Sequence, residues 1–184
     1  MSGPVVTAEW LAAHREAVRV VDVRDAWEYD ALGHVPGAVN VPFDSFRAAE
    51  HAAEAGEPAA GADDDTEGGG NGKRQGMLPD PDEFASLLGE AGVSRASDVV
   101  AYDDHHGVFA ARLLVTLELY GHPRERLHLL DGDFSAWRLA HETSEAAPAV
   151  ESTTYEVREP AASPLVEADE IAAALDDPAV VIVD

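Results

Sequence analysis

The chain has 184 residues, of which 46% are hydrophobic and 26% charged, as is typical of one soluble domain with a packed core. Acidic residues number 36 against 12 basic ones, and the net charge of −24 excludes nucleic acid as a partner, because phosphates would be repelled. No apolar stretch approaches the roughly 20 residues of a membrane-spanning helix. Residues 1–4 lack the basic and apolar parts of a secretion signal, so we expect a cytoplasmic protein with no membrane partner.

The acidic residues are spread along the whole sequence, and Lys73 is its only lysine. Clear apolar periodicity argues against disorder for most of the chain. We therefore interpret the acidity as the surface of a halophile's protein, on which dense carboxylates keep the molecule hydrated at high salt. The sequence contains no cysteine, which excludes disulfides, thiolate metal sites and cysteine nucleophiles within this chain.

The first part of the sequence predicts short alternating elements. Thr7 is a plausible helix N-cap, and Asp25 with Glu28 forms the capping-box pattern of a second, small helix. Short β-branched runs favour buried strands, and the Gly-His-Val-Pro-Gly run favours a turn. The predicted helix, strand, small helix, turn and strand cover residues 7–14, 18–23, 25–28, 33–37 and 38–41.

Residues 48–76 are dominated by Ala, Glu, Asp and Gly, and we predict a flexible acidic insertion there. Order resumes with Asp80, an N-cap followed by a proline at the first helical position. The later elements are predicted as a helix, a strand, a loop, a helix, a strand and a helix over residues 81–91, 98–102, 103–107, 108–120, 126–130 and 133–137. Strands that alternate with helices in this way predict an α/β fold, a parallel sheet with helices on both faces.

The end of the chain resembles its beginning. Residues 166–175 resemble residues 6–15, and residues 180–184 resemble residues 18–22. We interpret residues 1–142 as a first domain and 143–165 as an interdomain linker, within which residues 153–157 could form a short edge strand. Residues 166–184 are then the first helix and strand of a second repeat, which predicts that the chain is a fragment of a longer, two-domain protein.

Four motifs in order resemble those of the rhodanese family of sulfurtransferases. They are Asp-Val-Arg-Asp at residues 22–25 with the Gly-His-Val-Pro-Gly turn, the segment 77–84, the strand 99–102 and the Gly-Asp-Phe-x-x-Trp run at residues 132–137. The resemblance implies a rhodanese-like sheet. It also marks a set of motif or interface residues: Asp22, Arg24, Glu28, Gly33, His34, Pro36, Gly37 and Arg112.

The resemblance also implies a reaction, the transfer of a sulfane sulfur from thiosulfate to a thiophilic acceptor through a cysteine after the strand at 99–102. A loop of inward-facing amides that leads into a helix lowers the pKa of such a thiol. Asp103 occupies that position here, so this chain contains no catalytic residue. We expect backbone amides to hold the Asp103 carboxylate in a vestigial loop made of Asp103, Asp104, His105, His106 and Gly107.

The spacing of this loop, three residues between Asp103 and Gly107, resembles the first, inactive domains of tandem sulfurtransferases. The expected partner is therefore a second rhodanese domain of the same chain that carries the cysteine, with a small anionic sulfur donor and a thiophilic acceptor. Thiosulfate is the leading donor and 3-mercaptopyruvate the near alternative. A non-enzymatic binding or regulatory module is the contrasting hypothesis, which the sequence after Asp184 would decide.

The sequence does not favour two other kinds of site. The Asp-Asp-His-His run at residues 103–106 has metal-ligand residue types, but adjacent side chains point apart and no further ligands cluster nearby, so no metal is expected. Phosphatases that share this fold carry a Cys-x5-Arg loop, which is absent here. The resemblance implies no cofactor.

Overall fold

The computed structural model describes residues 3–47, 78–160, 165–175 and 177–182. Its centre is a five-stranded sheet in the order β1-β5-β4-β2-β3, and every pair of neighbouring strands is parallel. The strands are β1 (Val5–Val6), β2 (Arg19–Asp22), β3 (Val39–Asn40), β4 (Val99–Tyr102) and β5 (Leu127–Leu130). The helices are α1 (Ala8–His14), α2 (Ala26–Ala31), α3 (Pro81–Glu90), α4 (Val108–Leu119), α5 (Asp133–Ala140) and α6 (Ala168–Ala174), with 3₁₀ turns η1 (Phe43–Phe46) and η4 (Arg124–Arg126).

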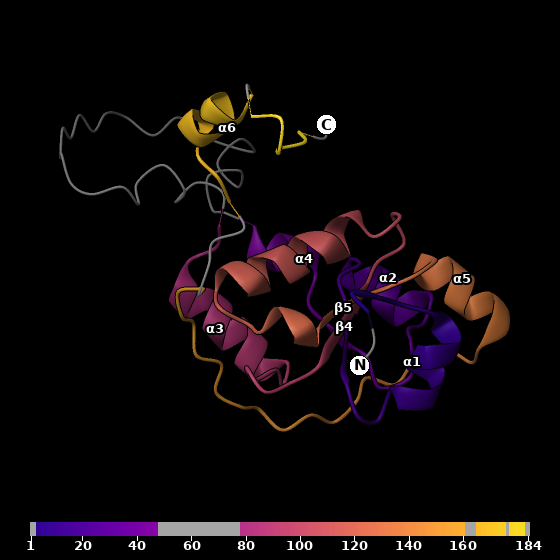
Figure 1. Cartoon of the computed structure of the whole chain (residues 1–184). Coiled ribbons are helices and arrows are strands. Elements are labelled where there is room, and N and C mark those ends of the chain that lie inside the picture. The colour runs from indigo at the N-terminus through magenta and orange to yellow at the C-terminus, as the bar shows by residue number, and fades with distance from the viewer. Residues whose placement is uncertain (1–2, 48–77, 161–164, 176, 183–184) are drawn as a thin grey trace, which may run out of the picture.

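The sheet separates two hydrophobic cores, because successive residues of a strand face opposite sides. Val99 and Ala101 of β4 face the core that α3 and α4 cover, whereas Val100 and Tyr102 face the core that α1 and α5 cover. Figure 1 shows the same layers, with α3 and α4 on one side of the strands and α1, α2 and α5 on the other. The predicted α/β fold with helices on both faces is confirmed.

Local sequence signals explain where the helices begin. The hydroxyl of Thr7 accepts a hydrogen bond from the backbone N–H of Trp10 at 3.2 Å, and so caps α1. At the start of α3, the carboxylate of Asp80 accepts from the N–H groups of Asp82 and Glu83 at 2.9 and 3.1 Å. These side chains satisfy amides that have no partner within the helix.

The prediction of four strands was incomplete, because β1 also belongs to the sheet. It is only two residues long and Val5 is 53% exposed, so its sequence carries little strand signal. Pairing with Leu129 and Leu130 of β5 nevertheless places it at one edge of the sheet. The predicted insertion at residues 48–76 lies outside the described residues.

The segment after α5, which includes the predicted linker, packs against the helices of the sheet domain in its described part, residues 141–160. Tyr155 is only 4% exposed and belongs to the core under α3 and α4. The N–H of Thr153 donates to the carbonyl of Gly89, and the N–H of Arg158 to that of Tyr120. The edge strand predicted at residues 153–157 was wrong, because this segment bonds to helix ends and not to a strand.

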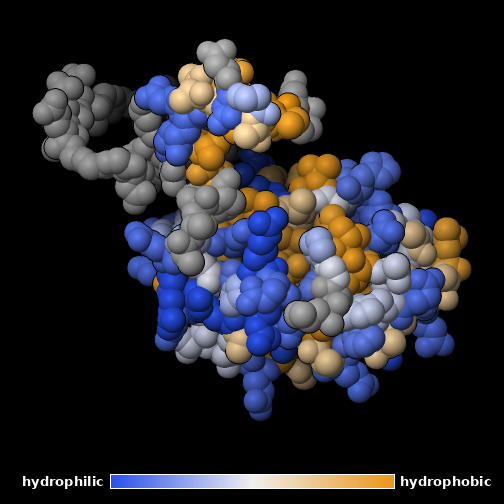
Figure 2. Space-filling view, viewed as in Figure 1, coloured by the Kyte–Doolittle hydropathy of each residue, from blue (hydrophilic) through white to orange (hydrophobic). Residues whose placement is uncertain are grey.

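The predicted helix of the second repeat is present as α6, which Figure 1 shows apart from the sheet, close to the C-terminus. Residues 180–182, in the predicted second strand, form no strand, and Val181 is 83% exposed. A lone strand gains no stability without neighbours to pair with. Figure 2 shows a mainly hydrophilic face, with hydrophobic residues gathered over α4 and on the segment that carries α6.

Candidate functional site

The loop after β4 is built around the buried carboxylate of Asp103. Oδ1 accepts hydrogen bonds from the N–H groups of His105 and Gly107, both at 2.8 Å. Oδ2 accepts from the N–H groups of Phe109 and Ala110, at 2.8 and 3.0 Å. The side chain thus takes up four backbone donors of the loop and of the first turn of α4, in a place with no exposure to solvent. Such a ring of donors stabilises negative charge.

The backbone of the loop needs two residues in the left-handed region to bring those amides inward. His106 has φ +58° and Gly107 has φ +80°. A Cβ on Gly107 would lie 3.1 Å from the Leu129 side chain, so glycine serves both the dihedral angle and the packing. The sequence signal for the loop, a glycine just before an apolar helix, therefore reflects the geometry of the amide ring.

Asp104 and His106 connect this loop to the start of α5. The carboxylate of Asp104 accepts from both the N–H and the hydroxyl of Ser135, at 2.9 and 3.0 Å. The ring of His106 is almost fully exposed, and its Nδ1 lies 3.6 Å from the carboxylate of Asp133. Asp133 has φ +56°, a left-handed conformation in which glycine is favoured.

A second buried polar network lies beside the first, at the end of β2. The guanidinium of Arg24 donates to the carboxylate of Asp22, with Nη2 2.6 Å from Oδ2, and also to the carbonyl of Gly33 at 2.8 Å. Tyr102 donates its hydroxyl to Asp22 at 2.6 Å and accepts from the N–H of Val35 at 3.1 Å. Burial, and then the charge of Asp22, raise the pKa of Tyr102 well above its usual value, so its phenol stays a donor.

Phe134 joins the two networks. Its N–H donates to the carbonyl of Asp103 at 2.9 Å, and its ring lies 3.7 Å from the guanidinium carbon of Arg24. A cation over an aromatic face is favourable when both groups are buried. The structure therefore brings Asp103, Asp22 and Arg24 into one contiguous polar region at the carboxyl ends of β2 and β4.

The Gly-His-Val-Pro-Gly turn lies against this region and also holds the segment after α5. His34 is fully buried, stacks on Tyr29 with ring centroids 3.7 Å apart, and has its Nε2 3.2 Å from the carbonyl of Ala146. The turn itself uses φ +79° at Gly33 and φ +86° at Gly37, on either side of His34 and Pro36. His34 thus has a packing position and anchors residues 144–146.

The remaining motif residues lie farther from the loop centre. Glu28 accepts a hydrogen bond from the N–H of Asp25 at 3.3 Å and so supports the start of α2. Arg112 lies on α4 and is half-buried, and its carbonyl accepts from the hydroxyl of Thr116. The amide ring is made by the backbone N–H groups of residues 105, 107, 109 and 110, so Glu28 and Arg112 belong to the framework of the motif rather than to the ring.

Three residues of the site were not assigned a role from the sequence: Tyr102, Phe134 and Ser135. A tyrosine at the end of a buried strand must find a partner for its hydroxyl, which is the signal that could have identified Tyr102. The roles of Phe134 and Ser135 depend on α5 starting beside the loop after β4. That proximity follows from the pairing of β4 with β5, which local sequence does not show.

The functional groups of the loop after β4 limit the reactions that it could carry out. The described loop offers carboxylates, imidazoles and amides, and the whole sequence has no thiol. Among the described residues no three His, Asp or Glu side chains gather closely enough to hold a metal ion. No helix within the described ranges is long and apolar enough to cross a membrane. The amides of this strand–loop–helix turn hold the carboxylate of Asp103, and the loop has no thiol that could carry a persulfide.

The fold and this loop define an α/β protein whose parallel sheet carries an anion-holding turn at the carboxyl end of β4. The family model of the rhodanese-like domain matches residues 7–140, and the chain belongs to that family. The order of its motifs and the place of Asp103 after β4 agree with this membership.

Relatives that match this chain include sulfurtransferases. A thiosulfate sulfurtransferase of Corynebacterium glutamicum is 31% identical over 159 residues, which are 84% of this chain and 44% of that protein. A probable 3-mercaptopyruvate sulfurtransferase of Pseudomonas aeruginosa is 46% identical over 63 residues, 34% of this chain and 22% of that protein. The chain therefore spans less than half the length of these relatives.

Solved structures show the same fold. The crystal structure of the 3-mercaptopyruvate sulfotransferase SseA from Escherichia coli superimposes with a TM-score of 0.63 at 24% identity, and the match covers 94% of this chain and 62% of that chain. At this identity the likeness supports the fold alone.

Proposed function

We propose that this chain is the non-catalytic rhodanese domain of a thiosulfate sulfurtransferase, and that a second domain of the same protein supplies the nucleophilic cysteine. The observation that carries the proposal is the position of Asp103. Its carboxylate accepts four backbone N–H groups at 2.8–3.0 Å, where a catalytic thiolate of the family would stand. A carboxylate there neutralises the converging amide dipoles and cannot form a persulfide.

In the proposed reaction the thiolate of the second domain attacks the outer sulfur of thiosulfate. A sulfur–sulfur bond forms on the enzyme, the sulfur–sulfur bond of thiosulfate breaks, and sulfite leaves with the electron pair. The persulfide then gives its outer sulfur to a thiophilic acceptor and the thiolate is regenerated. This domain takes no part in bond making. Its role is to pack against the second domain and wall its cleft.

The length of the relatives supports the division into two domains. The match to the Corynebacterium protein covers 44% of that protein, which leaves room for a second unit of similar size. The resemblance of residues 166–175 to residues 6–15, and the helix α6 formed there, are consistent with a second repeat. The cytoplasmic location and the halophilic surface expected from the composition are part of the same proposal.

3-Mercaptopyruvate is the second candidate donor, because the relative with 46% identity over 63 residues is a probable 3-mercaptopyruvate sulfurtransferase. The choice between donors depends on the loop that carries the cysteine. Rates of the longer protein with thiosulfate and with 3-mercaptopyruvate, measured side by side, decide between them.

The experiment that tests the proposal uses a longer protein that continues beyond Asp184. It is incubated with thiosulfate, and the persulfide is located by mass spectrometry of its peptides. We expect one added sulfur atom on a cysteine in the second unit, and loss of activity when that cysteine is replaced by serine. A longer protein without any cysteine would leave only the non-enzymatic binding module.

A further inference from the structure

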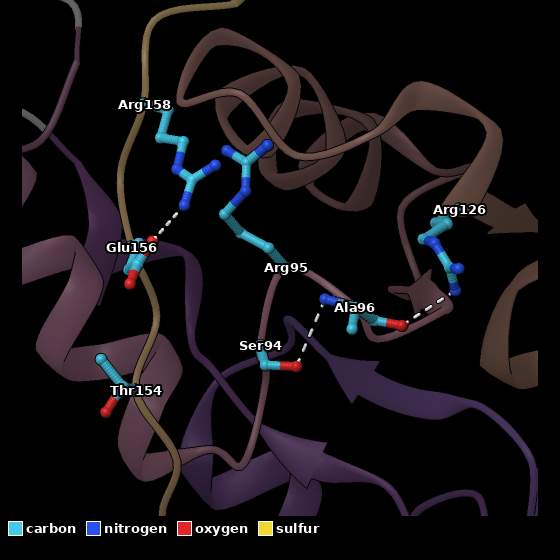
Figure 3. Close-up of a pocket in the computed structure, with 7 residues that line it drawn as sticks. All are labelled: Ser94, Arg95, Ala96, Arg126, Thr154, Glu156 and Arg158. Atoms are coloured by element: carbon cyan, nitrogen blue, oxygen red, sulfur yellow. Dashed lines mark hydrogen bonds and ion pairs between the residues drawn. The ribbon is translucent and has the colours of Figure 1, made fainter.

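A pocket of about 490 Å³ lies at the end of the sheet opposite to Asp103. Residues 94–96 precede β4 and Arg126 precedes β5, so the pocket is at the amino ends of these parallel strands. Its other wall is the segment after α5 (Figure 3). The lining residues are Ser94, Arg95, Ala96, Arg126, Thr154, Glu156 and Arg158.

The pocket gathers positive charge in a protein that has little of it. Lysine and arginine together number 12 against 36 acidic residues, yet three arginines line this one pocket. Arg126 is paired with Asp98 at 2.9 Å, and Arg158 is paired with Glu156 at 2.5 Å. Arg95 has no ion pair among the described residues, so the group retains an excess positive charge.

Among the three arginines of the pocket, Arg95 gives the strongest indication of a bound anion. Its Nη1 is buried and has no hydrogen-bond partner within the described part of the chain. A buried donor without an acceptor costs free energy, and a charged one costs more. Figure 3 shows the Arg95 side chain extending from the loop before β4 toward the side of the pocket where Arg158 lies.

A glycine at the end of α4 leaves space for the guanidinium of Arg95. A Cβ on Gly121 would lie 2.8 Å from Nη1 of Arg95 and 2.6 Å from the carbonyl oxygen of Arg158. Gly121 also has φ +78°, so a larger residue there is disfavoured twice. The end of α4 therefore leaves space in which this guanidinium is held close to the segment that carries Arg158.

From these observations we propose that the pocket binds an oxyanion of the phosphate or sulfate class, either free or as a group on a small molecule. The planar guanidinium group offers paired N–H donors that match two oxygens of such an anion. Arg95 lines the pocket with a guanidinium whose Nη1 has no acceptor among the described residues, and Arg158 and Arg126 add positive charge to the lining. The hydroxyl groups of Ser94 and Thr154 line the same space.

This site is separate from the proposed sulfurtransferase role. The four residues of β4 lie between it and Asp103, a span of about 13 Å along an extended strand. The Asp103 amides are already occupied by a carboxylate, whereas the buried Nη1 of Arg95 lacks an acceptor in the part of the chain that the structure describes. The proposal thus stands or falls independently of where the catalytic cysteine lies.

The test is isothermal titration calorimetry of the 184-residue chain with sodium phosphate, sodium sulfate and a sugar phosphate, at constant low chloride concentration. We expect saturable binding of phosphate and sulfate, and Arg95→Gln should weaken it by about tenfold or more, because hydrogen bonds to charged groups are lost. Tighter binding of the sugar phosphate would identify a phosphorylated small molecule as the source of the anion, and equal binding would identify the free ion.

The matched control is Arg138→Gln, which removes the same charge from an exposed position on α5. It should bind as the wild type does. Circular dichroism checks the fold of each variant, and Arg158→Gln, at an exposed position, provides a second variant if Arg95→Gln does not fold. Absence of saturable binding to every probe, or equal affinities for the pocket variant and the Arg138 control, would overturn the proposal.

Discussion

The amide ring around Asp103 makes a quantitative prediction for the variant Asp103→Asn. Asparagine has nearly the same shape, but one of its two terminal groups is an NH₂ that donates and cannot accept. Two of the four backbone N–H groups that now donate to the carboxylate would then face another donor. Neither orientation of the amide avoids this, because each carboxylate oxygen accepts two of them.

The magnitude follows from those two lost bonds. A hydrogen bond to a charged group contributes about 1.5–3 kcal/mol, so Asp103→Asn should lower the free energy of unfolding by about 3–6 kcal/mol. Because small domains are stable by only about 5–15 kcal/mol, the loss is large and easily measured. The cost is raised further because the site is fully buried and water cannot replace the missing acceptor.

Urea unfolding followed by circular dichroism measures this difference, provided that the slope of the transition is unchanged. The matched control is Asp131→Asn, an exposed position one residue after β5, which should stay within about 0.5 kcal/mol of the wild type. If Asp103→Asn is also within about 1 kcal/mol of the wild type, the amide ring does not hold the carboxylate as described.

Three further predictions concern the rest of the molecule. Arg24→Met should lower the free energy of unfolding, measured in urea, by about 3–5 kcal/mol, because Asp22 is left buried and charged without its partner. A decrease of less than about 1 kcal/mol would refute this. Burial lowers the pKa of His122 from its ordinary 6.5. The stability gained from burying a neutral imidazole is therefore fully present above pH 6.5 and is lost as the pH falls below that value. His122→Gln should therefore lose stability less steeply than the wild type on acidification, and parallel curves would contradict this. With a net charge of −24, the melting temperature should rise from low to molar salt, and a flat profile would contradict the halophilic interpretation.

The fold was largely predictable because its signals are local. The caps at Thr7 and Asp80, and the apolar strand ending at Tyr102, mark element boundaries within a few residues of sequence. What local signals could not provide was the long-range pairing. Strand β1 exists because β5 offers it a free edge, and the segment around Tyr155 is held by the ends of α3 and α4.

The candidate site divides in the same way. Asp103 and the glycine that follows it could be identified from their place between a strand and an apolar helix. The contact of Arg24 with Phe134 joins residues 110 positions apart, and Asp104 accepts a hydrogen bond from Ser135, 31 positions further along the chain. The arginine pocket was not predicted at all, since its members come from residues 94–96, from Arg126 and from residues 154–158.

The most direct test of the central claim is the formation of thiocyanate from thiosulfate and cyanide by the 184-residue chain alone. The account predicts a rate no greater than that of the reaction without protein, because the only group in the family's nucleophile position is the carboxylate of Asp103. Turnover by this chain, proportional to its concentration and retained after repurification, would contradict the account.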